Sequence, residues 1–246
     1  MAGNIVGLLL SWAILWLMER RSLLALGFTP PGKRFFQFAL GFFFSGIVCA
    51  VIKLAQSSML HVTWQLNPQI TLSKIGHHLS WNFNSVLFEE LIFRGALLYI
   101  AIRKLGAVKA ILLSAICFGI YHWFSYGLFG NIIPMIVVFV ITGLMGWVWA
   151  YAFNKTSSMA LPIGFHLGWN FTFNAIFSKE FTSDPILILT GGEQSQQLEG
   201  LALLANFILQ NLLPSILTFL FIKYFIKQAK EKQIPAEKKV PLALKN

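Results

Sequence analysis

The sequence predicts an all-α membrane protein, a polytopic bundle of about seven transmembrane helices. Hydrophobic residues make up 57% of the chain and charged residues only 11%, whereas a soluble domain carries about 25% charged residues. The apolar residues also gather in largely uncharged runs of about 20 residues, which is the length that spans a bilayer. Both observations favour a chain buried in lipid over a soluble domain.

Short connections join the apolar runs into one predicted transmembrane domain over residues 1–226. The predicted spans cover residues 1–18, 35–55, 76–102, 107–124, 131–153, 159–177 and 200–226. Pro, Gly and basic residues separate the first two runs, and the long uncharged stretch from 110 to 154 divides at its Ser-Tyr-Gly and Gly-Asn sequences. The polar stretches 56–75 and 178–199 are predicted loops, and the Lys-rich residues 227–246 are predicted to be a disordered tail.

The basic residues predict the orientation of these spans. The net charge is +10, but Lys and Arg cluster at the ends of apolar runs, which argues against nucleic acid as a partner. With seven spans, the tail and the loops after the first, third and fifth spans share one side, and 15 of the 19 basic residues lie there. The positive-inside rule therefore places the N-terminus outside and the C-terminus in the cytoplasm.

Two adjacent acidic residues, Glu89 and Glu90, lie inside the third predicted span, with Arg94 one helical turn later. A carboxylate at the centre of a span costs roughly 2.5–3.5 kcal/mol, so the pair needs partners or a function. On a helix, Glu90 and Arg94 share a face and can form an ion pair. Glu89 points about 100° away from Glu90. The spacing predicts one structural acid and one that is free for chemistry, against the plainer alternative of a buried ion-pair network.

Two further polar pairs lie on separate predicted spans. Phe118 and His122 are four residues apart on the fourth, and His166 and Asn170 are four apart on the sixth. Each pair therefore shares one helix face. A lone His in an apolar helix is usually a hydrogen-bonded core residue, but intramembrane Glu and His tend to face the bundle interior, where they can converge. Straight, full-length helices would not bring these residues level, so either the fourth span is tilted or offset, or the predicted boundaries are wrong by several residues.

Three motifs occur in this order, each on its own apolar helix: Glu-Glu-x-x-x-Arg, Phe-x-x-x-His and His-x-x-x-Asn. This pattern resembles that of the CPBP family of intramembrane proteases, which are related to the C-a-a-X prenyl protease and to bacteriocin-processing proteins. The resemblance implies hydrolysis of a peptide bond in or beside the membrane. It implies that Glu89 is the general base that activates water, assisted by His122. It also implies that His166 and Asn170 stabilise the oxyanion.

The resemblance further implies that Glu90, Arg94 and Phe118 order the site. The physical chemistry agrees, because a carboxylate in low-dielectric surroundings is a stronger base for water. Preset hydrogen-bond donors around an oxyanion are worth about 3–4 kcal/mol each.

A zinc ion is the alternative to a metal-free glutamate mechanism. Glu89, His122 and His166 together match the three-ligand set of a catalytic zinc site. However, the sequence has no His-Glu-x-x-His motif, and a zinc enzyme would need a separate base. Glu90 is available as that base, but it is also the expected partner of Arg94. The sequence therefore favours a site without a metal and leaves zinc possible.

The expected partners are the lipid bilayer and a membrane-anchored protein or peptide substrate, and the motifs carry no information on the oligomeric state. A multi-pass protein of a bacterial plasma membrane is the expected setting, from the small size and the resemblance. Two other functions remain open. One is a non-catalytic membrane scaffold or immunity protein with the same fold. The other is a transporter or proton relay, which intramembrane Glu and His chains also mark.

Overall fold

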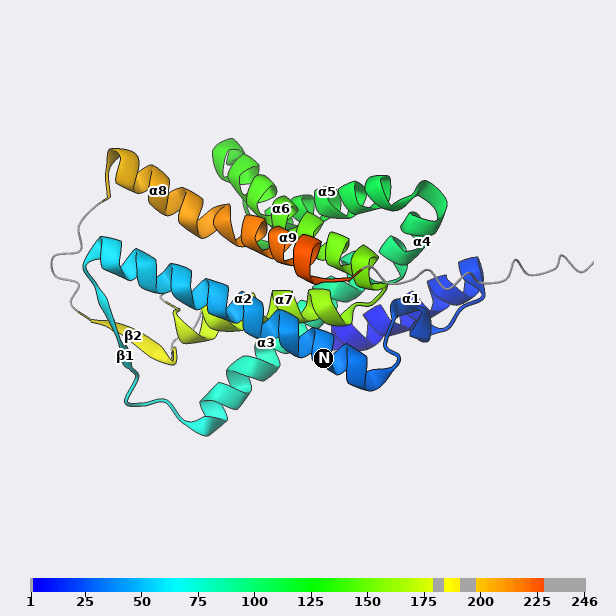
Figure 1. The fold of residues 1–246 in the computed structure, drawn as a ribbon, viewed down its shortest axis with the longest axis horizontal. Helices are drawn as coiled ribbons and strands as arrows, with labels where there is room; N and C mark the ends of the chain where they lie inside the picture. The colour runs from blue at the N-terminus through cyan, green and yellow to red at the C-terminus, as the bar shows by residue number, and fades with distance from the viewer. Residues whose placement is uncertain (1, 179–183, 191–197, 228–246) are drawn as a thin grey trace, which may run out of the picture.

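The computed structural model describes residues 2–178, 184–190 and 198–227. It is an elongated helical bundle with a small pair of strands at one end (Figure 1). The predicted all-α class is therefore confirmed in its main part. Nearly all of the predicted tail, residues 228–246, lies outside the described residues.

Each predicted span corresponds to one helix or to two consecutive helices. The helices are α1 (Ala2–Glu19), α2 (Pro31–Leu60), α3 (Leu72–Phe93), α4 (Ala96–Leu105), α5 (Ala107–Ser125), α6 (Ile132–Thr156), α7 (Ala160–Phe171), α8 (Gly200–Asn211) and α9 (Leu213–Phe225). A 3₁₀ turn covers Leu23–Leu26, and a π-helical turn over Thr172–Ile176 continues α7. The strands are β1 (Thr63–Leu66) and β2 (Leu187–Thr190).

The strands are a feature that the sequence analysis missed. β1 and β2 pair in antiparallel register, with Thr63 opposite Thr190 and Leu66 opposite Leu187. They lie in the two stretches that were predicted to be loops, 56–75 and 178–199. Each strand is only four residues long. The pairing joins segments more than 120 residues apart in the sequence, so there is no hairpin turn from which it could be predicted.

The third predicted span, 76–102, is not one helix, and this expectation was wrong. The helix ends at Phe93, and α4 begins at Ala96 after a sharp turn at Arg94 and Gly95. A side chain at Gly95 would overlap the carbonyl oxygen of Leu91, so the turn requires glycine. The Ser114 hydroxyl of α5 donates to the Phe93 carbonyl at 2.9 Å. This bond satisfies one of the carbonyls that the helix end leaves unpaired.

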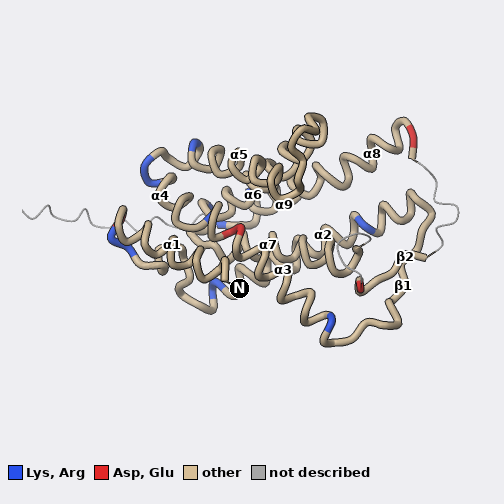
Figure 2. Tube along the Cα trace, turned by 180° about the vertical axis from the view of Figure 1, so that it is seen from behind, with Lys and Arg blue, Asp and Glu red and all other residues tan. Residues whose placement is uncertain are grey.

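In the part of the chain that the structure describes, four helices, α1, α2, α5 and α6, are long and apolar enough to cross a membrane. A fifth span results if α8 and α9, bent by 43° at their junction, count as one. The count of seven spans is therefore not confirmed, and the orientation stays a prediction. Figure 2 shows Lys and Arg gathered at the end of the bundle where α1 ends and α4 lies.

Helices α2 and α7 pack closely against each other through small residues. Side chains at Gly164 and Gly168 would overlap the carbonyl oxygens of Phe38 and Phe42. The hydroxyl of Ser45, on α2, donates to the Phe165 carbonyl of α7 at 2.7 Å. Helices in membranes associate through such close backbone packing and polar bonds, because lipid offers no hydrophobic drive between them.

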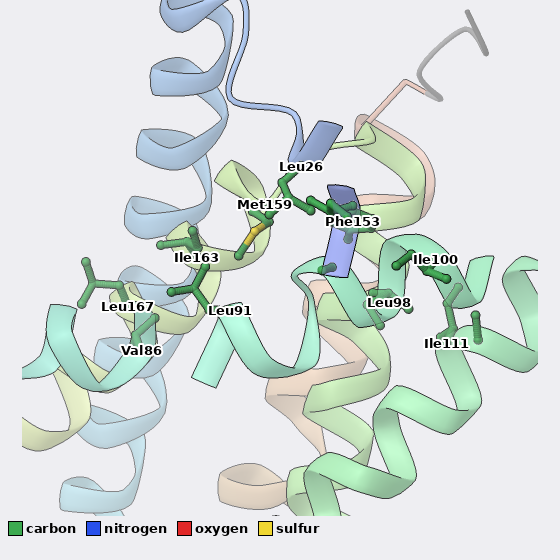
Figure 3. Close-up of a cluster of buried hydrophobic side chains, with 14 residues drawn as sticks. Leu26, Val86, Leu91, Leu98, Ile100, Ile111, Phe153, Met159, Ile163 and Leu167 are labelled. Atoms are coloured by element: carbon green, nitrogen blue, oxygen red, sulfur yellow. The ribbon is translucent and has the colours of Figure 1, made fainter. Parts of the chain in front are cut away.

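A buried apolar cluster lies where α3 and α7 meet (Figure 3). Val86 and Leu91 of α3 face Ile163 and Leu167 of α7, and the cluster continues to Leu98 beyond the break. Since Glu89 and Glu90 lie between Val86 and Leu91, this packing fixes the part of α3 that carries both acids.

We expect Gly164→Ala to destabilise the protein. The added methyl group would overlap the Phe38 backbone, and overpacking of this kind costs about 1–3 kcal/mol. The matched control is Gly76→Ala in α3, where an added side chain meets nothing within 4 Å. That change should be neutral or stabilising, by up to about 1 kcal/mol. Thermal unfolding in detergent compares the two, and equal melting temperatures would contradict the close contact.

Candidate active site

Glu90 and Arg94 form the buried ion pair that their spacing predicted. Arg94 Nη1 lies 3.1 Å from Glu90 Oε1, and both side chains are fully buried. The pair survives the end of α3 because the Arg94 amide still donates to the Glu90 carbonyl, at 2.8 Å. The last turn of the helix therefore holds both charges on one face.

His166 of α7 contacts both acids. Its Nδ1–H donates to Glu90 Oε1 at 2.9 Å, and its Nε2 lies 3.8 Å from Glu89 Oε2. Glu90 Oε1 thus accepts from Arg94 and from His166 at once. Two bonds to charged or polar donors offset part of the desolvation cost of a buried carboxylate.

Glu89 is held differently from its neighbour. Its side chain is 12% exposed, and it makes no hydrogen bond to any residue that the structure describes. Its contact with the His166 ring is longer than a hydrogen bond. The structure therefore separates one carboxylate that is bound in a network from one that is open to a further partner.

His122 and Phe118 bring α5 to the same place. The Nδ1–H of His122 donates to the Phe118 carbonyl at 2.8 Å, which leaves Nε2 as the other ring nitrogen. The Phe118 ring stands edge-on to His122 and to His166, with ring centroids 4.6 and 6.1 Å apart. The Arg94 guanidinium lies 4.1 Å from the centre of the Phe118 ring, as a cation–π contact. No hydrogen bond or ion pair joins His122 to Glu89 among the described residues.

The fourth predicted span reaches the site because of its offset. Figure 1 shows that α5 ends near the middle of the bundle's long axis rather than at the end where the strands lie. His122 is in the last turn of α5, so its depth matches that of the acids. Two tyrosines flank the His122 ring edge-on, Tyr121 at 5.3 Å and Tyr126 at 5.2 Å between centroids.

Asn170 lies one turn beyond His166 on α7 and is half-buried. Its side chain forms no hydrogen bond to a described residue. The structure thus brings Glu89, Glu90, Arg94, Phe118, His122 and His166 together by direct contacts, whereas Asn170 is placed beside them by its helix position alone.

Two residues of α6 complete the site, and the sequence analysis gave them no role. The Trp149 ring stacks on the His166 ring, with centroids 4.0 Å apart and planes inclined by 23°. A side chain at Gly146 would lie 2.8 Å from the Phe118 ring and 3.0 Å from Arg94 Nη2. Gly146 therefore makes room for the guanidinium. A glycine and a tryptophan in an apolar span carry no signal of their own, so sequence reasoning had no means of finding them.

The zinc alternative needs three ligands that reach one ion. Among the described residues, no group of three His, Cys, Asp or Glu side chains is placed so as to hold a metal.

Residues 71–172 match the family model described as Type II CAAX prenyl endopeptidase Rce1-like. The matched segment contains all three motifs, from the acidic pair to Asn170, and the match confirms the resemblance to the CPBP family that these motifs indicate. Comparisons with curated proteins and with solved structures gave no match.

We expect Arg94→Met to unfold the site, because it leaves Glu90 as an uncompensated buried charge. Breaking a buried pair in this way costs about 3–5 kcal/mol. Glu90→Gln in the same chain should restore part of the loss, since it removes that charge. The control is Arg103→Met, whose pair with Glu19 is partly exposed and is worth about 0–1 kcal/mol. Thermal unfolding is the measurement, and a melting temperature for Arg94→Met no lower than the control's would contradict the account.

Proposed function

We propose that the protein is an intramembrane endopeptidase that cleaves a membrane-anchored peptide or protein with a water molecule activated by Glu89. The match to prenyl endopeptidases supports hydrolysis of a peptide bond. The observation that carries the residue assignment is the unequal state of the two acids. Glu90 is bonded to Arg94 and His166, while Glu89 has no hydrogen-bond partner among the described residues.

In the proposed reaction, Glu89 takes a proton from water, and the resulting hydroxide attacks the carbonyl carbon of the scissile bond. The carbonyl oxygen becomes an oxyanion in a tetrahedral intermediate. The carbon–nitrogen bond then breaks, and the proton held by Glu89 passes to the leaving amine. A positioned base or acid of this kind contributes typically 10²–10⁴-fold to a rate. Its partial exposure gives Glu89 access to water that the fully buried Glu90 lacks.

The other motif residues supply donors and orientation in this proposal. His122 has its Nδ1 fixed on a backbone carbonyl, so its Nε2 is free to assist the base or to contact the substrate. His166 and Asn170 lie on one face of α7 and are proposed to stabilise the oxyanion, Asn170 through its amide N–H and His166 as an imidazolium whose Nε2–H remains after its Nδ1–H has bonded Glu90. His166 is held on one side by Glu90 and on its face by Trp149. Donors that are fixed before the reaction need no reorganisation when charge develops.

The Glu90–Arg94 pair is proposed to order the site rather than to react. Arg94 is enclosed by the rings of Phe118 and Trp149, with its guanidinium carbon 4.1 and 5.3 Å from their centres. Glu90 then fixes the His166 ring through Nδ1. A carboxylate that orients a catalytic imidazole in this way also sets which ring nitrogen faces the substrate.

The apolar helices support an integral membrane protein, and we propose the plasma membrane of a bacterium as its location. The catalytic base of a soluble enzyme cannot reach a peptide bond that lies within the lipid bilayer. The proposed site places a carboxylate and two imidazoles inside the helical bundle, where such a bond can be reached. We propose that this mechanism needs no metal ion, and treatment with a zinc chelator tests the zinc alternative.

We expect Glu89→Gln to lower the rate of cleavage by at least 10²-fold, in line with loss of a general base. The substitution keeps the shape of the side chain and removes its basicity. Cleavage of a library of membrane-anchored peptides in liposomes is the measurement, with Glu199→Gln as a control for an acid outside the site.

Each protein is also assayed after treatment with a strong zinc chelator. A wild-type rate that survives the chelator supports the metal-free mechanism, whereas a rate lost to the chelator and restored by zinc would replace it with the zinc alternative. Undiminished cleavage by Glu89→Gln would overturn the assignment of the base.

A further inference from the structure

A row of polar side chains joins the candidate active site to the end of the bundle where the strands lie. Two contacts between α3 and the segment of α7 mark its ends. At the inner end, the His166 ring contacts Glu89 and Glu90. At the outer end Asn174, in the π-helical turn that continues α7, donates through Nδ2 to Asn82 Oδ1 of α3 at 3.1 Å. The two segments therefore run antiparallel, with a polar contact at each end.

Two more polar residues lie between these contacts. On α3, Ser85 comes three residues after Asn82 and four before the first acid, so it shares their helix face. On α7, Asn170 comes four residues after His166 and four before the π-helical asparagine. Both side chains are half-buried, and neither forms a hydrogen bond to a described residue. The row is therefore continuous in position and only partly bonded.

The outer end of the row reaches a charged surface. Asn82 Nδ2 donates to the His78 carbonyl at 2.9 Å, and His78 Nε2 lies 2.8 Å from the Asp184 carbonyl oxygen. The Asp184 carboxylate pairs with Lys74 at 3.1 Å, and both of these side chains are partly exposed. This is the end of the bundle that carries β1 and β2, away from α1 and α4 (Figure 1). The row thus leads from the two acids to the protein surface.

The environment of these side chains favours water over lipid. A carboxamide or hydroxyl without a hydrogen bond in apolar surroundings costs roughly 1–3 kcal/mol. α3 has 22 residues, yet it is not among the helices that are long and apolar enough to cross a membrane. Polar residues at membrane depth face the bundle interior or a water-filled space. Ser85, Asn170 and Asn174 retain donors and acceptors that no described residue uses, and water can bond to both kinds.

We propose that this row is hydrated, and that water reaches the candidate active site along the interface of α3 and α7 from the strand end. A bound water makes about three hydrogen bonds, and the hydroxyl and carboxamides offer them at successive helical turns. Because Glu89 lies at the inner end, the path would supply the water that it activates. That role rests on the proposed function, whereas the hydration does not. In the opposite case the row is dry, and its side chains only hold α3 against α7.

The test measures whether water reaches cysteines placed along the row. Cys49 and Cys117 are first replaced by Ala, and the full chain is placed in lipid nanodiscs, which leave both membrane faces open to solution. Ser85→Cys, Asn170→Cys and Asn174→Cys are each treated with a charged methanethiosulfonate reagent, and mass spectrometry follows the modification. The reagent needs a thiolate, which forms in water, so we expect all three to react at least about tenfold faster than a cysteine that faces lipid.

The matched control is Ile47→Cys on α2, at a similar depth. A side chain at its neighbour Gly46 would lie 3.1 Å from the Thr172 hydroxyl of the segment that carries the row. Ile47 itself is 62% exposed on a helix that can cross a membrane, so its side chain faces lipid and a cysteine there should react slowly.

The proposal is overturned if any folded row variant reacts no faster than Ile47→Cys. Reaction at Asn170→Cys without reaction at Asn174→Cys would mean that water enters from elsewhere. Melting temperatures show which variants fold, and Ser85→Cys, which exchanges only oxygen for sulfur, keeps the test decisive if an asparagine variant does not. The modification rates do not depend on cleavage, so a dry row and an inactive Glu89 are distinguished.

Discussion

The buried ion pair of Glu90 and Arg94 is the constraint on which the rest of the site depends. Two full charges removed from water are stable only with good geometry and further partners, and the fold supplies them from three more helices. His166 of α7 bonds Glu90, the rings of Phe118 and Trp149 enclose the guanidinium, and Gly146 of α6 leaves room for it. One interaction thus determines where α3, α5, α6 and α7 meet.

The contact between α2 and α7 supports this arrangement from outside. Gly164 and Gly168 flank His166 in sequence and press against the α2 backbone, and the Ser45 hydroxyl bonds the carbonyl of Phe165. His166 is therefore carried on a helix that close packing prevents from sliding or rotating. A catalytic group must be held within about half an ångström of its working position. The glycine contacts on one side of α7 therefore help to position His166, which lies on the other side.

Spacing along the chain predicted the local features of the site and missed those created by tertiary contact. The pairing of Glu90 with Arg94 follows from four residues on one helix, and so does the shared face of Phe118 and His122. The break at Gly95 was not predicted, because the hydrophobic run continues through it. The strands were missed because their partners are distant in sequence. Trp149 matters only through its neighbours in space, which one sequence does not reveal.

The central claim is that Glu89 activates water and does not itself form a covalent intermediate. A single turnover in ¹⁸O-labelled water tests it, with mass spectrometry of both the cleaved peptide and the enzyme segment that contains Glu89. The account predicts one heavy oxygen in the new carboxylate of the product and none in the Glu89 side chain. Heavy oxygen in the Glu89 carboxylate after one turnover would show that this residue attacks the peptide bond directly, and would contradict the account.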